Sequence, residues 1–442
     1  MKRLLGEAGF FAYLDALNQP YTRALRVNLL LRPDGTPPCP IEGLGAPVPW
    51  AKGAYFVEGD ARPGLSPLHE GGLFYMQEPS ALTAVTALDP QPGERVLDLC
   101  AAPGGKSTQI AALMAGRGLL CCNEPIPSRA QILSRNIERM GVRNAVVLSA
   151  MPDALAPRFP AFFDRILVDA PCSGEGMFRR QPEARDEWDA DAPRRCADRQ
   201  MEILAQAAKM LRPGGTMVYS TCTFNDTENE GVLKRFLALH PEFSLVPFAL
   251  PGLPEAKDGY LHLYPHEMRG EGHFVSRLKK ADGADEADAP VQGAPQRKAP
   301  ARAAAKGKAP APIALPDVFS DAFAPERLYT AGDALWMLPE GISIERLSGL
   351  RVLRTGLLLA HAEGKRSEPD HALAMALRPE EAARTASLTQ TQALAYQAGE
   401  TLSLGDLPGG YTLLCCEGVS LGWGKQAGGL MKNHYPKGLR RR

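Results

Sequence analysis

The sequence predicts a doubly wound α/β domain, with a small α+β unit before it and a further compact region after it. From residue 73 to residue 280, short apolar runs typical of strands alternate with amphipathic stretches typical of helices. This alternation is the pattern of a parallel sheet covered by helices on both faces. The chain of 442 residues is also too long for one ordinary domain, and its apolar fraction of 45% is enough for several cores.

Residues 1–72 form the first predicted unit. A helical pattern over 3–17 is followed by a strand-like run over 24–31 and by a stretch rich in proline and glycine that ends near Gly72. One helix combined with short strands and turns is typical of a small α+β domain. We expect this unit to be an appendage of the central domain.

Residues 73–280 form the central predicted domain. A helix is expected after Lys106 and two more over 128–141 and 197–215, the last closed by a Gly-Gly stop. The predicted strands cover 95–100, 118–124, 145–150, 165–171, 216–222 and 273–279. Strands and helices in this order predict a doubly wound sheet.

Residues 281–312 are rich in alanine and proline and nearly free of large apolar side chains. Such a segment buries too little surface to offset the entropy of ordering it, so we predict a flexible linker. The rest of the chain divides into two small predicted pieces, over 313–380 and 381–442.

The composition favours a reduced, cytoplasmic protein. The sequence has no charged start followed by an apolar run of signal-peptide length, and no stretch long enough to cross a membrane. The nine cysteines include no CxxC pair and no cysteine–histidine cluster at zinc spacing, so we expect no disulfide framework and no metal. The net charge of +0 indicates no particular partner, although a neutral total can conceal a basic face.

A glycine–lysine turn, DLCAAPGGKST, follows the first predicted strand of the central domain at residues 98–108. A triphosphate-binding loop would need a glycine where Cys100 stands, and a dinucleotide fingerprint would need one where Ala102 stands. The turn still places small residues and a helix N-terminus at the edge where doubly wound sheets bind ligands. It therefore predicts a nucleotide-like ligand that has no pyrophosphate.

Glu124 supports this prediction. It ends the next strand, about twenty residues further on, where a carboxylate in such folds accepts both hydroxyls of a ribose. The alternative is a tight turn followed by an unrelated surface acid. Because two independently placed elements agree, we favour a cofactor site, and S-adenosylmethionine fits the loop better than a dinucleotide.

Two cysteines follow neighbouring predicted strands. Asp169 and Cys172 come just after one strand, and Cys222 comes just after the next, both in loops rich in small and polar residues. Adjacent strand ends would bring the two thiols together near the cofactor loop. We expect five other cysteines to be small packed residues: Cys100, Cys121, Cys196, Cys415 and Cys416.

These motifs resemble the Sun-type RNA cytosine-5 methyltransferases, and among them the RsmF-like 16S rRNA enzymes. The resemblance runs through MQEPSA, LDLCAAPGGKS, NE, LVDAPCSGEGMFR, LRPGGTMVYSTCTFNDTENE and EGHFVSRL in the central domain. The N-terminal LRVNLL and the C-terminal GWGKQAGGLMKNHYPKGLRR extend it over nearly the whole chain. It implies a Rossmann-like methyltransferase fold, S-adenosylmethionine as cofactor and RNA cytosine as substrate.

The resemblance also implies roles for both thiols. A thiolate that adds to carbon 6 of cytosine makes carbon 5 nucleophilic, and a second group then assists removal of the carbon-5 proton and release of the thiol. In the family, the cysteine of the TC motif attacks and that of the PC motif assists release, which implies these roles for Cys222 and Cys172. The reversed assignment, as in DNA cytosine methyltransferases, remains open. Asp169 would hold the cytosine edge near N3 and N4, with a turn-capping acid as the alternative.

The cofactor pocket that the resemblance implies is lined by Cys100, Ala101, Ala102, Pro103, Gly104, Gly105, Lys106, Glu124, Arg129 and Asp169. The sequence departs from the family at the position expected to contact the adenine. Many family members have an acid after the third strand, whereas this chain has Ser149 and Ala150 there and Asp153 only later.

The C-terminal tail has basic and aromatic residues and no acid over residues 424–442. Such a mixture neutralises phosphates and stacks on bases, and the resemblance implies a PUA-like module. The expected RNA-binding residues are Lys425, Lys432, Asn433, His434, Tyr435, Lys437 and Arg440. A disordered basic tail is the alternative. Together with residues 1–72, the module would grip RNA around a base extracted from its stack.

Three other functions remain open from the sequence. One is tRNA as substrate. Another is a catalytically inactive RNA-binding factor for ribosome assembly, which the intact Cys222, Cys172, Asp169 and Glu124 disfavour. A small-molecule methyltransferase would leave the basic tail and the second thiol without a purpose. We expect a monomer that binds 16S rRNA or the small ribosomal subunit and no membrane.

Overall fold

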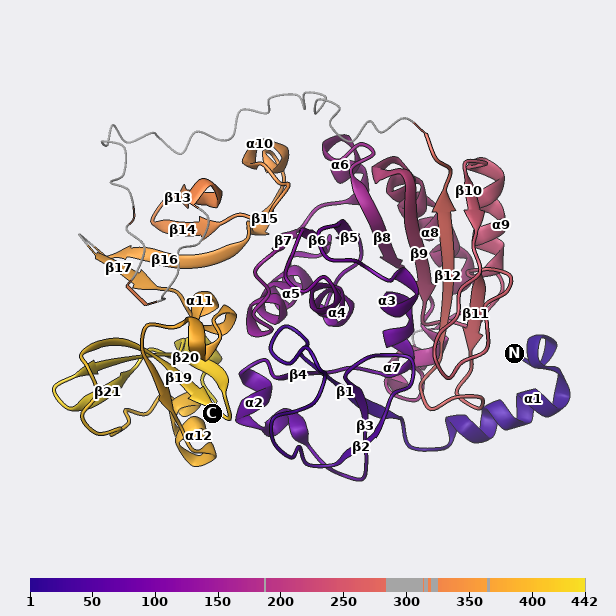
Figure 1. The fold of residues 1–442 in the computed structure, drawn as a ribbon. Helices are drawn as coiled ribbons and strands as arrows, with labels where there is room; N and C mark the ends of the chain where they lie inside the picture. The colour runs from indigo at the N-terminus through magenta and orange to yellow at the C-terminus, as the bar shows by residue number, and fades with distance from the viewer. Residues whose placement is uncertain (187, 284–312, 314–316, 319–324, 364–365, 442) are drawn as a thin grey trace.

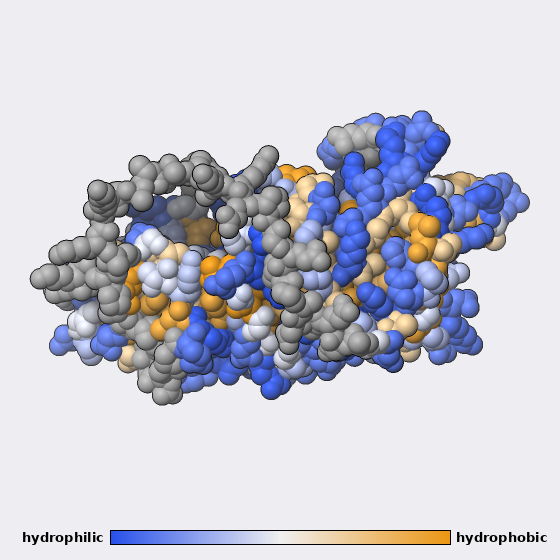
Figure 2. All heavy atoms as spheres, turned by 90° about the horizontal axis from the view of Figure 1, so that it is seen from above, coloured by the Kyte–Doolittle hydropathy of each residue, from blue (hydrophilic) through white to orange (hydrophobic). Residues whose placement is uncertain are grey.

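The computed structural model describes residues 1–186, 188–283, 313, 317–318, 325–363 and 366–441, which form four sheets with their helices (Figure 1). Most of the segment predicted as a linker, residues 284–312, lies outside the described residues. No helix of the described ranges is long and apolar enough to cross a membrane. Figure 2 shows hydrophilic and apolar residues interspersed on one face of the molecule.

The N-terminal unit contains the predicted helix, α1 (Lys2–Leu17), and an antiparallel sheet in the order β2-β3-β1-β4. The strands are β1 (Arg23–Val27), β2 (Leu44–Pro47), β3 (Ala54–Val57) and β4 (Phe74–Met76). β1 is shorter than the predicted run over 24–31. The chain turns at Asn28, whose side chain accepts from the Leu30 amide at 3.1 Å and donates to Met140 O of the central domain at 3.0 Å.

The central sheet confirms the predicted doubly wound fold. Its order is β10-β12-β9-β8-β5-β6-β7-β15, with β11 beside β12. The strands β5 (Arg95–Asp98), β6 (Leu119–Asn123), β7 (Ala145–Leu148), β8 (Phe163–Asp169) and β9 (Leu211–Thr221) pair in parallel, and β10 (Phe243–Leu245), β11 (Tyr260–Leu263) and β12 (His273–Lys280) are antiparallel additions. The order reverses at β5, and this topological switch point is where ligands bind in such folds.

Helices cover both faces of this sheet. On β5, Val96 belongs to the apolar cluster that includes residues of α3 (Thr83–Leu88), α4 (Gly105–Leu113) and α5 (Pro127–Arg139), and Leu97 belongs to the cluster of α8 (Ala192–Met210) and α9 (Glu230–Leu239). Burial on both faces explains why the strands are continuous apolar runs. α8 ends at Met210, earlier than the predicted residue 215, because residues 211–215 belong to β9.

The first C-terminal piece contributes a strand to the central sheet. Its own sheet comprises β13 (Leu328–Ala331), β14 (Ala334–Met337), β16 (Leu357–Glu363) and β17 (Arg366–Pro369), with α10 (Ile344–Leu347) before β15 and α11 (His371–Ala376) after β17. β15 (Val352–Arg354) instead pairs antiparallel with β7 at the edge of the central sheet. Arg354 of β15 also forms an ion pair with Glu138 of α5.

The last C-terminal piece shares a hydrophobic core with the N-terminal unit. It contains β18 (Thr385–Ser387), β19 (Gly410–Cys416), β20 (Val419–Ala427), β21 (Leu430–Asn433) and α12 (Gln390–Ala398). Leu421 and Tyr396 of this piece are buried in one cluster with Leu25, Leu68 and other residues of the N-terminal unit. The two modules therefore pack together as one body.

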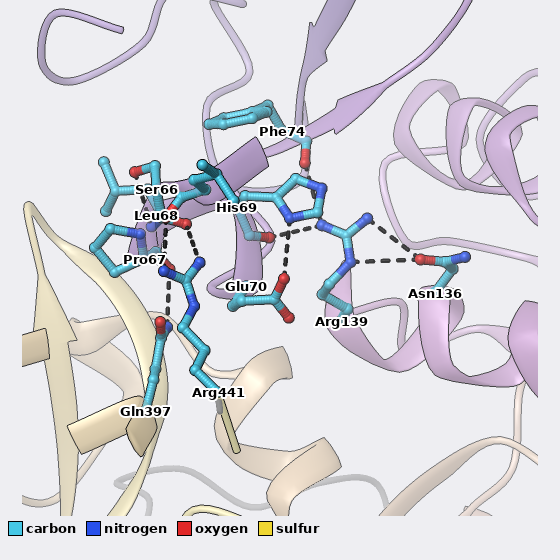
Figure 3. A network of polar contacts seen from close by, with 11 residues as sticks. Ser66, Pro67, Leu68, His69, Glu70, Phe74, Asn136, Arg139, Gln397 and Arg441 are labelled. Carbon is cyan, nitrogen blue, oxygen red and sulfur yellow. Dashed lines mark hydrogen bonds and ion pairs between the residues drawn. The ribbon is translucent and has the colours of Figure 1, made fainter. Parts of the chain in front are cut away.

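Polar contacts continue this junction into the central domain (Figure 3). From the last piece, Arg441 donates to Leu65 O at 2.6 Å, and Gln397 donates to Pro67 O at 3.0 Å, within the first turn of α2 (Pro67–Glu70). From the opposite side, Arg139 of α5 donates to His69 O at 2.7 Å. The short helix α2 thus joins the N-terminal, central and C-terminal parts.

We predict that Leu421→Ala destabilises the protein by about 2–5 kcal/mol, because it leaves a cavity in the core that joins the two terminal modules. Leu430→Ala, in the same module but 50% exposed, should change the free energy of unfolding by less than about 0.5 kcal/mol. Urea unfolding of both variants measures this difference. Equal effects would show that the shared core contributes little stability.

Candidate functional site

The predicted cofactor loop leaves β5 at the switch point of the sheet and enters α4 at Gly105. Gly104 has a φ of 113°, in the region that favours glycine, and a Cβ there would lie 3.2 Å from Leu133 Cδ1 of α5. The glycine thus permits both the turn and the close packing of α5. The first turn of α4 directs its free backbone N–H groups toward the carboxyl edge of the sheet.

Side chains and backbone around the loop hold its peptide groups. Asn136 donates to Pro103 O at 2.9 Å, and Arg129 donates to Ala102 O at 3.2 Å. The Ala101 amide donates to Asn123 O at 2.9 Å. Arg129, which was predicted to line the cofactor pocket, thus contacts the loop and also lies 3.4 Å from Glu124 Oε2.

Asp98 lies beneath the loop and is completely buried. One carboxyl oxygen, Oδ2, accepts from Ser107 Oγ at 2.6 Å, and the other has no hydrogen-bond partner among the described residues. Burial raises the pKa of Asp98 to about 7. A buried carboxyl with a free oxygen is therefore placed directly under the loop.

Glu124 follows β6 and is only 3% exposed. Its Oε1 accepts from the Ile126 amide at 2.9 Å, and its Oε2 lies 3.4 Å from Arg129 Nη1. Each carboxylate oxygen has two lone pairs, so the group retains acceptor capacity for a pair of hydroxyls.

Ser149 and Ala150, rather than an acid, follow β7, as the sequence indicated. The Ser149 amide donates to Arg351 O beside β15 at 2.9 Å, so backbone of the first C-terminal piece lies against this edge. The Ala150 amide donates to Asn123 Oδ1 at 3.1 Å. Asp153 is exposed on α6 (Pro152–Leu155).

Asp169 ends β8 within a cluster of polar side chains. Its Oδ2 lies 2.8 Å from Lys106 Nζ, and its Oδ1 accepts from Ser220 Oγ at 2.8 Å. His273 Nε2 lies 3.5 Å from the same Oδ1. Burial opposes ionisation of Asp169, but Lys106 and His273 outweigh it and hold its pKa well below the ordinary value. Asp169 is therefore an ionised acceptor, and Lys106 is its counter-ion.

The structure brings the two predicted thiols into contact. Cys172 follows β8, Cys222 follows β9, and their Sγ atoms lie 3.2 Å apart. The hydrogen bond with Cys222, burial and the negative charge of Glu228 raise the pKa of Cys172 well above its usual value. The two sulfurs therefore share a hydrogen bond in which either can be the donor.

The other cysteines differ from this pair. Cys121, Cys415 and Cys416 are buried, and Cys100 and Cys196 are partly buried. Burial raises the pKa of Cys100 well above its usual value, which opposes a role as nucleophile. Among the residues that the structure describes, no group of three or more histidine, cysteine or acidic side chains is arranged to hold a metal ion.

The seven tail residues that were predicted to bind RNA differ in their burial and in their contacts. Tyr435 is 3% exposed and packs against Tyr396, and Asn433 donates to Tyr396 O at 2.7 Å. These two residues stabilise the module, and the buried Tyr435 ring is not presented for stacking on a base. His434 pairs with Glu368 at 3.1 Å, and Arg440 packs on Gly399.

Two of the three lysines in the predicted set are its most exposed members. Lys432 and Lys437 are exposed, and Lys425 lies half-buried over the Tyr411 ring, 4.6 Å from its centroid. Their ammonium groups are the members of the set best placed to meet phosphates.

No role was predicted for His273, Ser220, Glu175 or Glu228. All four lie within the quoted motifs EGHFVSRL, STCTFNDTENE and CSGEG, so the sequence indicated that they are near the site. Most of their contacts could not be predicted, because those contacts join segments far apart in the chain.

Family models match four consecutive segments of the chain. A model described as 16S rRNA methyltransferase RsmB/F matches residues 85–279. The N-terminal domain of 16S rRNA methyltransferase RsmF matches residues 1–79, the RsmF first C-terminal domain matches 316–377, and the RsmF PUA domain matches 383–441.

Proteins named ribosomal RNA small subunit methyltransferase F align with nearly the whole chain. The one from Erwinia tasmaniensis is 34% identical over 99% of this chain and 95% of its own length, and the one from Klebsiella pneumoniae is 34% identical over 97% and 92%. The chain belongs to the RsmF family of 16S rRNA methyltransferases. This membership confirms the family predicted from the motifs, including the C-terminal PUA domain.

Solved structures agree with the fold of the central domain. A methyltransferase homolog protein from Pyrococcus horikoshii has a TM-score of 0.52 and 29% identity, covering 63% of this chain and 97% of its own. NSun6 from the same organism, solved with SFG, has a TM-score of 0.54 and covers 64% and 97%, and its 22% identity supports the fold alone.

We predict a pH-dependent stability that comes from Asp98. Its folded pKa of about 7 exceeds its ordinary value of 3.8, so the folded state binds more protons than the unfolded state between these values. The stability contributed by protonated Asp98 is therefore lost as the pH rises through this window. Asp98→Asn cannot ionise and lacks this loss.

Urea unfolding of the wild type and of Asp98→Asn, from about pH 5 to about pH 8, measures the difference. The wild type should lose stability relative to the variant as the pH rises. Parallel pH profiles would contradict the raised pKa.

Proposed function

We propose that this chain transfers a methyl group from S-adenosylmethionine to carbon 5 of a cytosine in 16S rRNA, through a covalent adduct with Cys222. The observation that carries the proposal is the 3.2 Å contact between Cys222 Sγ and Cys172 Sγ beside Asp169. A methyltransferase that alkylated a nitrogen or oxygen atom would need no such pair of thiols.

The residues at the switch point fit the cofactor. The loop over 100–105 lets a ligand approach its backbone, and the buried carboxylate of Glu124 suits the two ribose hydroxyls. S-adenosylmethionine, when bound, supplies an electrophilic methyl group. The sulfonium charge of such a ligand would be favoured by the carboxylates of Asp169 and Glu124 at this edge.

Cys222 begins the proposed reaction. Its thiolate adds to carbon 6, a carbon–sulfur bond forms, and the electron pair of the C5–C6 double bond moves to carbon 5. Carbon 5 would then take the methyl group as the bond between the methyl carbon and the sulfonium sulfur breaks, which leaves S-adenosylhomocysteine. The raised pKa of Cys172 favours Cys222 as the sulfur that attacks.

Cys172 completes the proposed reaction. Its sulfur accepts the carbon-5 proton while its own thiol proton passes to the departing Cys222 sulfur, across the 3.2 Å contact. The carbon–sulfur bond breaks and the C5–C6 double bond is restored. Cys222 then releases a proton to water, which balances the reaction.

Asp169 and Lys106 orient the base. An ionised carboxylate accepts hydrogen bonds, so Asp169 fits the exocyclic N4 amino group of cytosine better than the ring N3, which is itself an acceptor. Lys106, 2.8 Å away, keeps the carboxylate in this state.

The small-subunit target follows from the RsmF family and from the names of the relatives. We retain Lys425, Lys432 and Lys437 as proposed phosphate contacts, and we place the protein in the cytoplasm with its substrate. A tRNA substrate would use the same site. An inactive assembly factor would have no use for a thiol pair and an ionised Asp169 at hydrogen-bonding distances.

We predict that Glu124→Ala weakens S-adenosylmethionine binding by about 1–3 kcal/mol, because the ribose hydroxyls lose their acceptor. Calorimetry of the purified variant measures it, with Asp153→Ala as a control because Asp153 is an exposed acid after the next strand. Equal affinity of Glu124→Ala and wild type would remove Glu124 from the cofactor site.

We predict opposite outcomes for the two thiols. Cys222→Ala should abolish both methyl transfer and any covalent adduct, because no bond to carbon 6 can form. Cys172→Ala should still attack but release poorly, so a protein–RNA adduct should accumulate. Denaturing gels with 16S rRNA transcript and S-adenosylmethionine separate these outcomes.

An adduct formed by Cys222→Ala but not by Cys172→Ala would reverse the two roles. Full turnover by both variants would contradict the covalent mechanism.

A further inference from the structure

Two carboxylates connect the loops that carry the thiols. We call residues 170–176 the PC loop, which contains Cys172, and residues 222–229 the TC loop, which contains Cys222. Glu228 belongs to the TC loop and Glu175 to the PC loop. Each carboxylate binds the loop opposite its own.

Glu228 is completely buried and anchors the PC loop. Its carboxylate accepts from the Ser173 amide at 3.0 Å and from the Ser173 hydroxyl, next to Cys172 in the chain. It also accepts from Asn225 Nδ2 and Gln200 Nε2, each at 2.8 Å. All these donors are uncharged, so the negative charge of Glu228 remains unneutralised by them near the thiols.

Glu175 makes the reciprocal connection. Its Oε2 accepts from the amides of Phe224 at 2.8 Å and Asn225 at 3.1 Å, just after Cys222. The Gly176 amide donates to Cys222 O at 2.8 Å, and Ser173 Oγ lies 2.9 Å from Thr223 Oγ1. The two loops are therefore hydrogen-bonded to each other on both sides of the thiols.

We infer that Glu228 and Glu175 are positioning residues that hold the two thiols in contact, and that Glu228 also places its negative charge beside Cys172. Hydrogen bonds to a buried carboxylate are stronger than neutral ones, so they suit a fixed distance between two loops. This inference rests on the proposed two-thiol reaction and adds the groups that arrange it.

The pKa of Cys172 supports a negative charge beside this thiol. The hydrogen bond with Cys222, burial and the charge of Glu228 all raise the pKa of Cys172. Other titratable groups around the two loops include Tyr219 and Cys196, whose own pKa values burial raises, Glu175, which binds the TC loop, and Lys106, the counter-ion of Asp169. Glu228 is the acid that acts on Cys172 and binds the residue next to it.

The test compares Glu228→Gln with Glu230→Gln, the same substitution two residues away. Glu230 begins α9 and pairs with His262 at 2.6 Å, outside the contacts between the loops. Glu228→Gln keeps the shape of the side chain but removes its charge and turns an amide group toward donors. We expect a fall in kcat of about 100-fold with little change in KM or in cofactor affinity, because the loss is one of alignment. Glu230→Gln should behave as wild type.

A second measurement needs no RNA and separates the electrostatic effect of Glu228 on Cys172 from a general disturbance of the fold. Each thiol is alkylated by iodoacetamide across a range of pH and the product is measured by mass spectrometry. The midpoint is the pH at which the alkylation rate of Cys172 or of Cys222 reaches half of its maximum. Removing the negative charge should move the Cys172 midpoint down by about 1 pH unit in Glu228→Gln and leave it in place in Glu230→Gln. Turnover equal to that of Glu230→Gln, or an unmoved Cys172 midpoint, would overturn the inference.

If Glu228→Gln fails to fold, Ser173→Ala removes the hydroxyl that binds Glu228 and Thr223 and should also lower kcat, but less strongly. Unchanged kcat in Ser173→Ala would then overturn the connection. The gels of Cys222→Ala test the covalent reaction separately. Loss of the adduct there, together with unaffected Glu228→Gln, would reject the positioning role and leave the proposed function standing.

Discussion

The parallel pairing of β8 with β9 is the constraint on which the candidate site depends. Its register places Asp169 opposite Ser220, so the two loops leave the sheet side by side and carry Cys172 and Cys222 to within 3.2 Å. The same strand ends face the helix start that carries Lys106. One strand pairing therefore brings together the two thiols, one of them the proposed nucleophile, and the ionised carboxylate, which come from segments about fifty residues apart.

The parts expected to hold RNA are fixed to this sheet by packing. The N-terminal unit and the PUA domain share one core, and β15 of the first C-terminal piece extends the central sheet. The proposed RNA-binding surfaces therefore pack against the sheet that carries the thiol site. Such packing would suit an enzyme that acts on a base within folded RNA, where shape contributes to recognition.

The sequence was sufficient for features that depend on local pattern. The apolar runs located the strands of the central sheet, and the small-residue turn after β5 located the loop at the switch point. The thiol pair could be predicted because parallel strands end at one edge. Features that depend on distant partners could not be predicted. β15 is a short strand, and no local sequence pattern indicates its pairing with β7. Tyr435 lies among basic residues, as an RNA-contacting aromatic residue would, but its ring packs in a core. Glu228 lies in a run of polar residues that gives no sign of its contacts with Ser173 and Gln200.

Bisulfite sequencing of ribosomal RNA tests the central claim most directly. Cells that lack this protein would be compared with the same cells carrying the wild type or Cys222→Ala. The account predicts at least one cytosine of 16S rRNA that resists conversion only with the wild type. Identical 16S rRNA patterns in all three, or a protected cytosine that persists with Cys222→Ala, would contradict it.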